Sequence, residues 1–243
     1  MGVFIISGTI FTMLYIVSTP IGNIEDISLR ARKILEEIPY VITESSQDSG
    51  KLFHILGIGK KKMIKYNDRN KARATDEIIA LLKEEDAVYV TSAGTPVVSD
   101  PGSDLVQRAS KEGIGISVIP GPSALTSILA ASGLHARTVI FVGFLQKKKK
   151  KIQELLGGHG TDVLFVFFES PYRIIKTLEY IKEILPFSEL CVGKEMTKVH
   201  EEYIRGSAQE VLLYLDKHPD KVRGEFSIAL YVPKKVKTPP EMQ

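Results

Sequence analysis

Three loops rich in glycine and proline each follow a short apolar run, and together they constrain the fold more than any single residue. The runs cover residues 14–17, 87–90 and 116–119, and the loops that follow them read STPIGN, SAGTP and PGPSA. An apolar strand that stops at Gly or Pro and gives way to a helical pattern is typical of an open α/β sheet, whose strand ends form a crevice. We therefore expect a ligand site made largely of backbone.

The composition is that of an ordinary globular protein, with 44% hydrophobic and 25% charged residues. A chain of 243 residues can form one large or two modest domains. The single cysteine, Cys191, has no partner for a disulfide or a structural zinc site, and it lies in a strand-like apolar setting. We expect Cys191 to be a core residue and the protein to be cytoplasmic, where thiols stay reduced.

The first residues raise the question of a membrane or signal segment, because residues 2–17 carry no charge. The stretch lacks a basic start and contains Ser7, Gly8, Thr9 and Thr12. It is also shorter than the about 20 apolar residues that a spanning helix needs. The sequence therefore predicts a first strand near Met13 behind an extension of residues 1–12, with no membrane partner.

Apolar strands alternate with amphipathic helices along the whole chain, which predicts an α/β fold of two α/β domains. We expect an N-terminal domain over residues 13–122, a C-terminal domain over residues 123–235 and a tail from 236 to 243. Asp100 and Pro101 predict a helix start, as N-cap and first helical residue. The last strand, residues 224–232, alternates in hydropathy and is expected to be antiparallel with one face less buried. Further strands are expected at 40–43, 63–66, 138–142, 163–168, 190–193 and 201–205, and helices at 27–38, 50–56, 72–83, 149–156, 172–185 and 208–217.

Several common catalytic signatures are missing from the sequence. There is no G-x-G-x-x-G dinucleotide loop, no Walker loop and no G-x-S-x-G nucleophile motif. The five histidines show no metal-ligand spacing, so we expect no metal. The backbone loops that remain suit an uncharged or zwitterionic ligand with many hydrogen-bonding groups.

Lysine is concentrated in two places, although the net charge is only +3. Lys60, Lys61 and Lys62 form one cluster with Lys65, and residues 147–151 are all lysine. Such runs are either solvated surface or contacts to a phosphate backbone, and the sequence does not separate the two interpretations.

Six segments in the same order resemble those of a known enzyme family. They are LYIVSTPIGNIEDIS from Leu14, AGTPVVSDPG from Ala93, PGPSALTSILA from Pro120, FESPYR from Phe168, EMT with EEYIRG after Cys191, and GEF from Gly224. Together they resemble the bacterial small-subunit ribosomal RNA (cytidine-2'-O)-methyltransferases of the tetrapyrrole methylase superfamily. The match extends from Met13 to Val232.

The resemblance implies a methyltransferase with two α/β domains, S-adenosylmethionine (SAM) in the cleft between them, and usually a homodimer. The implied acceptor is a cytidine ribose 2'-hydroxyl of small-subunit ribosomal RNA, with the small ribosomal subunit as partner. The implied donor contacts are Pro20, Gly22, Asn23, Ala93, Gly94, Thr95, Pro96, Val98, Ser123, Ala124 and Phe168.

Three segments depart from the family pattern. Residues 44–47 read ESSQ where the family has an acid followed by Asp-Thr-Arg, residues 67–70 read NDRN for His-Glu-His-Asn, and residues 91–93 read TSA for Ser-Asp-Ala. The retained acid makes Glu44 the first candidate for a general base, with Asp68 second. Candidate contacts to the RNA phosphates are Lys60, Lys61, Lys62, Lys147, Lys148, Lys149 and Arg173.

Arg173 has a second interpretation, because Glu169 lies four residues earlier at a predicted helix start and can form an ion pair with it. Two other functions also stay open. One is a methylase of a small, tetrapyrrole-like molecule, and the other is a SAM-binding, ribosome-associated protein whose altered cleft has lost activity.

Overall fold

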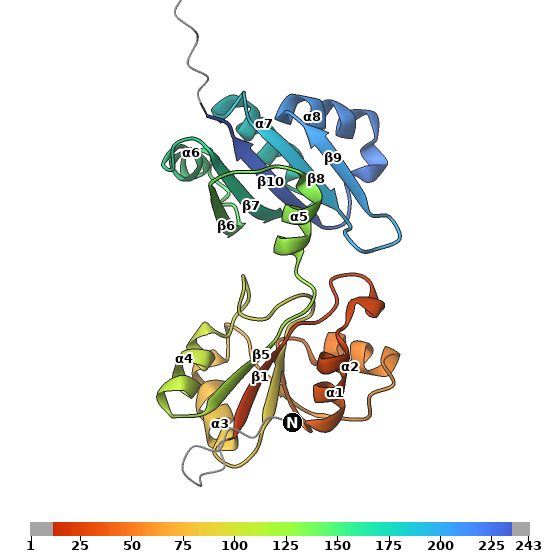
Figure 1. Cartoon of the computed structure of the whole chain (residues 1–243), viewed down its shortest axis with the longest axis vertical. Coiled ribbons are helices and arrows are strands. Elements are labelled where there is room, and N and C mark those ends of the chain that lie inside the picture. Colours follow the sequence, from red (N-terminus) through yellow and green to blue (C-terminus); the bar gives the residue numbers. More distant parts are fainter. Residues whose placement is uncertain (1–11, 235–243) are drawn as a thin grey trace, which may run out of the picture. The chain divides into compact units, whose positions relative to one another are not determined.

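A computed structural model describes residues 12–234, which fold into two compact units that divide between Ser123 and Ala124 (Figure 1). Apart from Thr12, the expected extension over residues 1–12 lies outside the described residues, as does the expected tail from 236 to 243. Each unit has its own sheet and core.

The first unit is built on a five-stranded parallel sheet in the order β3-β2-β4-β1-β5. Because all strands run the same way, their carboxyl ends meet at one edge. The strands are β1 (Met13–Val17), β2 (Tyr40–Thr43), β3 (Lys62–Lys65), β4 (Ala87–Val90) and β5 (Gly115–Ile119). The helices are η1 (Ile24–Asp26), α1 (Leu29–Glu37), α2 (Ser46–Ile55), α3 (Lys71–Leu82) and α4 (Ser103–Lys111).

Helices cover both faces of this sheet, as Figure 1 shows. Leu35 of α1 and Phe53 of α2 belong to one apolar cluster with Val88 of β4. Ile78 of α3 belongs to the other cluster, together with the neighbouring β4 residue, Tyr89. Both faces of β4 are therefore buried, which explains the uninterrupted apolar run in the sequence.

The second unit has a mixed five-stranded sheet in the order β6-β7-β10-β8-β9. Only β6 and β7 pair in parallel among the strands described, and the other three pairings are antiparallel. The strands are β6 (Thr138–Phe144), β7 (Val163–Glu169), β8 (Glu189–Lys194), β9 (Glu202–Gly206) and β10 (Phe226–Val232). The helices are α5 (Ala124–Ser132), α6 (Lys149–Gly157), α7 (Ile174–Ile184), α8 (Ala208–Lys217) and η2 (Pro219–Lys221). The predicted α/β class is confirmed in both units.

Helix α5 packs on one face of the second sheet, and α6, α7 and α8 pack on the other. Cys191 is buried beneath α5, so its prediction as a core residue is confirmed. The last strand is antiparallel to both neighbours, as expected, but the prediction that one face is less buried was wrong. Ser227 and Ala229 are buried beneath α5, because β10 is the central strand of the sheet.

The predicted start of the helix after β4 was also wrong. Helix α4 begins at Ser103, its N-cap is Gly102, and Asp100 lies in the preceding loop. That loop contains two non-glycine residues with positive φ, Val97 at 72° and Ser99 at 69°. These left-handed turns delay the helix beyond Pro101.

Candidate active site

The loops after β1 and β4 are joined by a pair of backbone hydrogen bonds. The amide of Thr19 donates to the carbonyl of Gly94, and the amide of Gly94 donates to the carbonyl of Thr19, each over 2.9 Å. Thr19 is fully buried. This two-way bridge fixes the backbone of both loops at the carboxyl edge of the sheet.

The third loop is attached to the same cluster. The amide of Ser18 donates to the carbonyl of Ile119 over 3.2 Å, and the hydroxyl of Thr95 donates to the carbonyl of Pro122 over 3.4 Å. The hydroxyls of Ser18 and Thr95 lie 2.9 Å apart. The structure therefore brings together the three loops that the sequence singled out.

Glycine is required where these loops approach each other most closely. A Cβ on Gly121 would lie 3.1 Å from the Cβ of Ser18, and Gly94 has a φ of +81°. The positive φ of Val97 is unusual because its branched side chain crowds the backbone. Strain of this kind collects at ligand-binding loops.

The predicted donor contacts differ in exposure. Gly22, Ala93 and Val98 are exposed, whereas Gly94 and Pro96 are buried. The others in the first unit, Pro20, Asn23, Thr95 and Ser123, are half-buried.

Three predicted donor contacts also have a local structural role or lie in the second unit. The side chain of Asn23 accepts a hydrogen bond from the amide of Glu25 and caps η1. Ala124 is the first residue of α5, in the second unit. Phe168, also in that unit, is half-buried and packs edge to face against the rings of Phe141 and Phe144, at centroid distances of 5.2 and 5.8 Å.

A hollow of about 730 Å³ lies where β2, β3 and β4 end. It is lined by residues 44–48, which follow β2, and by Lys65, the last residue of β3. Residues 67–69 and Ser92 complete the lining after β3 and β4. All three segments that depart from the family pattern therefore meet in one place. Both base candidates, Glu44 and Asp68, line this hollow.

The two candidate carboxylates have different partners. The Asp68 carboxylate pairs with Lys71 at 3.6 Å, and Lys71 also pairs with Asp104 at 3.4 Å. Glu44 is exposed and has no ion pair among the residues that the structure describes. Glu44 is thus the carboxylate whose oxygens are available to a ligand in the hollow.

Asp100 is a further carboxylate near this site, although the sequence predicted only a helix cap there. Burial raises its pKa, the charge of Glu44 raises it further, and a hydrogen bond from Thr91 opposes the rise. Its position in the glycine-proline loop after β4 was the available signal. Burial also raises the pKa of Tyr89, whose hydroxyl donates to the carbonyl of Pro101.

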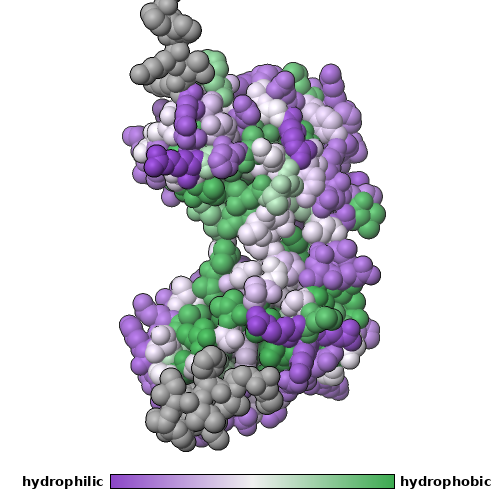
Figure 2. Space-filling view, viewed as in Figure 1, coloured by the Kyte–Doolittle hydropathy of each residue, from purple (hydrophilic) through white to green (hydrophobic). Residues whose placement is uncertain are grey.

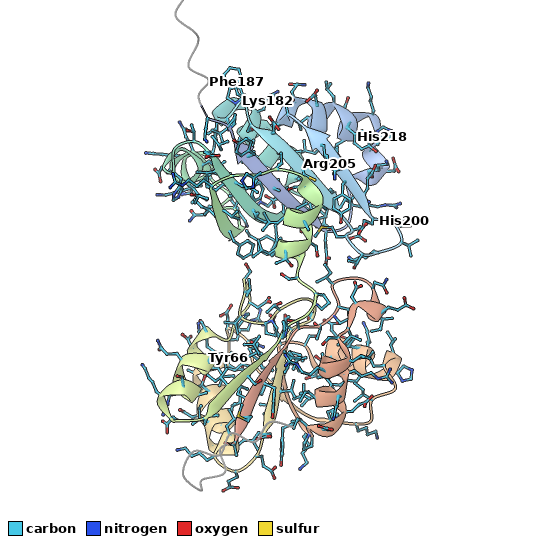
Figure 3. All side chains as sticks on the ribbon, viewed as in Figure 1. Tyr66, Lys182, Phe187, His200, Arg205 and His218 are labelled. Carbon is cyan, nitrogen blue, oxygen red and sulfur yellow. The ribbon has the colours of Figure 1, made fainter. Side chains whose placement is uncertain are left out.

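Tyr89 forms the floor beneath this loop together with a second buried tyrosine, Tyr66, which is labelled in Figure 3. The two rings meet edge to face with centroids 5.9 Å apart. Tyr66 directly follows β3, so the floor spans from the end of β3 to β4. This ring contact, with the hydrogen bond of Tyr89 to Pro101, ties the loop after β4 to the core of the first unit.

Lysines 60–62 lie at the amino end of β3, whereas the hollow lies at the carboxyl ends of the strands. Lys62 begins β3 and its ammonium donates to the hydroxyl of Tyr40, the first residue of β2. The ammonium of Lys61 donates to the carbonyls of Glu36 and Ile38, and burial lowers its pKa. The structure does not bring these lysines together with Glu44. The cations that do line the hollow are Lys65 and Arg69.

The remaining predicted phosphate contacts belong to the second unit. Lys147 and Lys148 precede α6, and Lys149 is its first residue. Arg173 pairs with Glu169 at 3.3 Å, as the second interpretation expected.

The described residues contain no group of three or more His, Cys, Asp or Glu side chains that could hold a metal. His200 and His218 of the second unit, for example, lie well apart (Figure 3). Within residues 12–234, no helix has both the length and the apolar character needed to cross a membrane.

Comparison with known proteins supports the resemblance in the sequence. The family described as Tetrapyrrole (Corrin/Porphyrin) Methylases matches residues 13–212. A protein of Thermotoga maritima named ribosomal RNA small subunit methyltransferase I is 41% identical over 218 residues, which cover 89% of this chain and 97% of that protein. A protein of the same name from Bacillus subtilis is 35% identical, covering 90% of this chain and 74% of its own.

Solved structures share the fold at low identity. Diphthine synthase matches with a TM-score of 0.68 and 14% identity, covering 90% of both chains. Cobalt precorrin-4 methyltransferase matches with a TM-score of 0.65 and 17% identity, covering 90% of this chain and 94% of the other. The chain therefore belongs to the tetrapyrrole methylase family and, within it, to the ribosomal RNA small subunit methyltransferase I family of SAM-dependent methyltransferases.

Proposed function

We propose that this protein transfers a methyl group from SAM to the 2'-hydroxyl of a cytidine ribose in small-subunit ribosomal RNA. The observation that carries the proposal is the full-length similarity to proteins named ribosomal RNA small subunit methyltransferase I, 41% identical in one case. The proposed partner is the small ribosomal subunit, and the 2'-hydroxyl of cytidine is the acceptor implied by the sequence segments. A homodimer and a cytoplasmic location stay predictions.

The three joined loops of the first unit fit the methyl donor. SAM supplies an electrophilic methyl group on a sulfonium, and its zwitterionic methionine part needs many hydrogen-bonding groups. Gly94 and Gly121 let the three loops approach one another closely, since a Cβ on Gly94 would meet Ile21 and one on Gly121 would meet Ser18. We assign donor binding to the loops that carry Pro20, Gly94 and Ser123.

The hollow beside these loops fits the acceptor side of the reaction. A ribose 2'-hydroxyl is a weak nucleophile, so a hydrogen-bond acceptor that takes its proton accelerates attack. Glu44 offers an exposed carboxylate at the hollow that has no ion pair among the described residues. We assign proton removal to Glu44, whereas Asp68 is already paired with Lys71.

The charge of the hollow favours RNA over a highly carboxylated tetrapyrrole. Lys65 and Arg69 line it with Glu44, Asp48 and Asp68, so its formal charge is −1 from two cations and three anions. This net negative charge opposes the approach of a molecule that carries several carboxylates. A single ribose needs only neutral hydrogen bonds there, and its phosphates can bind elsewhere.

The test measures methyl transfer from radiolabelled SAM to three acceptors: unmethylated small ribosomal subunits, large subunits and a reduced tetrapyrrole. We expect label in the RNA of small subunits alone. Label in the tetrapyrrole would support the small-molecule methylase instead. Binding of SAM without transfer to any acceptor would support the ribosome-associated protein that has lost activity.

A further inference from the structure

The lysine run in the second unit divides into paired and unpaired side chains. The ammonium of Lys149 bonds to the carboxylate of Glu183, and that of Lys151 bonds to Glu154 at 2.8 Å. These two lysines are neutralised within the protein. They have a structural explanation that does not require a ligand.

Lys147, Lys148 and Lys150 are exposed and have no ion pair among residues 12–234. Figure 2 shows strongly hydrophilic side chains gathered on the surface where α6 lies. We call these three side chains the free lysines. They place three uncompensated positive charges within four consecutive residues.

The position of the run at the start of α6 makes these charges unfavourable in the isolated protein. The N-terminus of a helix carries a partial positive charge, so a cation there costs about 0.3–1 kcal/mol. Helix α6 has no acidic residue in its first turn, and its N-cap, Lys148, forms no side-chain cap. A bound anion would relieve this repulsion, whereas solvated surface lysines give no reason for such a placement.

The segment that carries the free lysines is held by Arg173, a half-buried residue that pairs with the buried Glu169. The guanidinium of Arg173 donates to the carbonyl of Leu145 over 2.7 Å, two residues before Lys147. Arg173 is itself fixed by Glu169, whose side chain is fully buried and accepts a hydrogen bond from Thr177 over 2.7 Å. Leu145 is only 2% exposed and packs in the core. Arg173 is thus engaged on the protein side.

We infer that the free lysines Lys147, Lys148 and Lys150 form a binding surface for RNA phosphodiesters, and that Arg173 is a positioning residue that holds this surface in place. This inference rests on the proposed function, because it takes RNA as the partner. Among the predicted phosphate contacts of the second unit, Lys149 is paired with Glu183, so we assign its place as a phosphate contact to Lys150. Arg173 acts through Leu145 rather than on the phosphate.

Two double variants with equal charge loss test the surface. Affinity of the full chain for unmethylated small-subunit RNA is measured over a series of salt concentrations, for K147Q/K150Q and for K149Q/K151Q. Loss of two phosphate contacts lowers the steepness of log K against log salt by about 1.4–1.8. We expect this change in K147Q/K150Q and less than a third of it in K149Q/K151Q. Equal slopes in the two variants, changed or unchanged, would overturn the inference.

The failure of this inference can be separated from failure of the proposed function. If the wild-type chain binds and methylates the RNA but the two doubles have the same slope, only the free-lysine surface is refuted. If the wild-type chain binds SAM but neither binds nor methylates the RNA, both proposals fail together.

The role of Arg173 is tested in the background of K147Q/K150Q. A positioning residue acts through the lysines, so Arg173→Met should change the slope in the wild-type chain but add no further change in the double variant. Additive changes would show that Arg173 contacts phosphate itself. Thr177→Val is the control, since it removes the hydrogen bond that Thr177 donates to Glu169 and leaves the bond from Arg173 to Leu145 in place.

Discussion

The hydroxyl of Ser18 lies 2.9 Å from the hydroxyl of Thr95, so side chains as well as backbone join the loops after β1 and β4. The backbone bridge between Thr19 and Gly94 lies directly beside this contact. Together they join the two loops, to which we assign donor binding, through both side chains and backbone. Preorganised loops lose less entropy when a ligand binds, so this contact should contribute to affinity for SAM.

Replacing Thr95 by valine keeps the shape of the side chain and removes its hydrogen bonds to Ser18 and Pro122. At about 1 kcal/mol for each bond, we expect the dissociation constant for SAM to rise about tenfold or more. Isothermal titration calorimetry measures it. Thr138→Val is the control, because Thr138 is exposed at the start of β6 in the other unit. Equal affinities of the two variants would contradict the role of Thr95.

Gly102 is a glycine that the fold tolerates replacing poorly. Its φ is +132°, and an added Cβ would lie 2.4 Å from Cε1 of the buried Tyr89. We expect Gly102→Ala to lower the free energy of unfolding by about 2–4 kcal/mol through backbone strain and overpacking. Urea denaturation measures this loss. Gly59→Ala, with open space around the new Cβ, should change stability by less than about 0.5 kcal/mol. A small effect at Gly102 would mean that Tyr89 moves aside at little cost.

Strands were the easiest elements to predict from the sequence, because buried parallel strands are short, uninterrupted apolar runs. The predicted strand over residues 40–43 and the predicted helix over residues 208–217 agree with β2 and α8 at both ends. Helix α2 starts earlier than predicted, at Ser46, since the side chain of Ser45 caps the amide of Asp48. Gly50 within it looked like a boundary, but tertiary packing outweighs its low helix propensity.

The site was predicted in part. The convergence of the three loops followed from the rule that parallel strands end at one edge. Lys60, Lys61 and Lys62 lie at the amino end of β3, away from the hollow. The sequence could not predict this, because the bounds of β3 were needed to tell which end of the strand the lysines flank. Asp100 was not predicted as a site residue, because an Asp before a Pro is a typical N-cap. The turns with positive φ at Val97 and Ser99 place it in the loop before α4 instead.

Glu44→Gln tests the assignment of the general base. The amide keeps the size of the side chain but does not accept the hydroxyl proton, so we expect the single-turnover rate of methyl transfer to fall about 100-fold or more. Affinity for SAM should stay the same. Asp68→Asn is the matched control, and its rate should fall less than about threefold because Asp68 is engaged by Lys71. An unchanged rate in Glu44→Gln would remove Glu44 from the mechanism.

Asp100 should make stability depend on pH. Its pKa is raised by burial and by Glu44, so the folded state favours the neutral carboxyl. Its contribution is fully present below the unfolded pKa and is lost as the pH rises through the higher folded pKa. Asp100→Asn should therefore raise the melting temperature at pH 7, and the gain should shrink as the pH falls through the raised folded pKa and vanish below about 4, near the unfolded pKa. A gain that is constant with pH, or a loss at pH 7, would contradict the raised pKa.

The most direct measurement is the identity of the methylated nucleoside. Purified protein is mixed with SAM and unmethylated small ribosomal subunits, the RNA is digested to nucleosides, and the products are separated by mass spectrometry. We predict 2'-O-methylcytidine, absent when the protein is omitted and strongly reduced with Glu44→Gln. A base-methylated nucleoside, or no product from protein that binds SAM in the same preparation, would contradict ribose methylation.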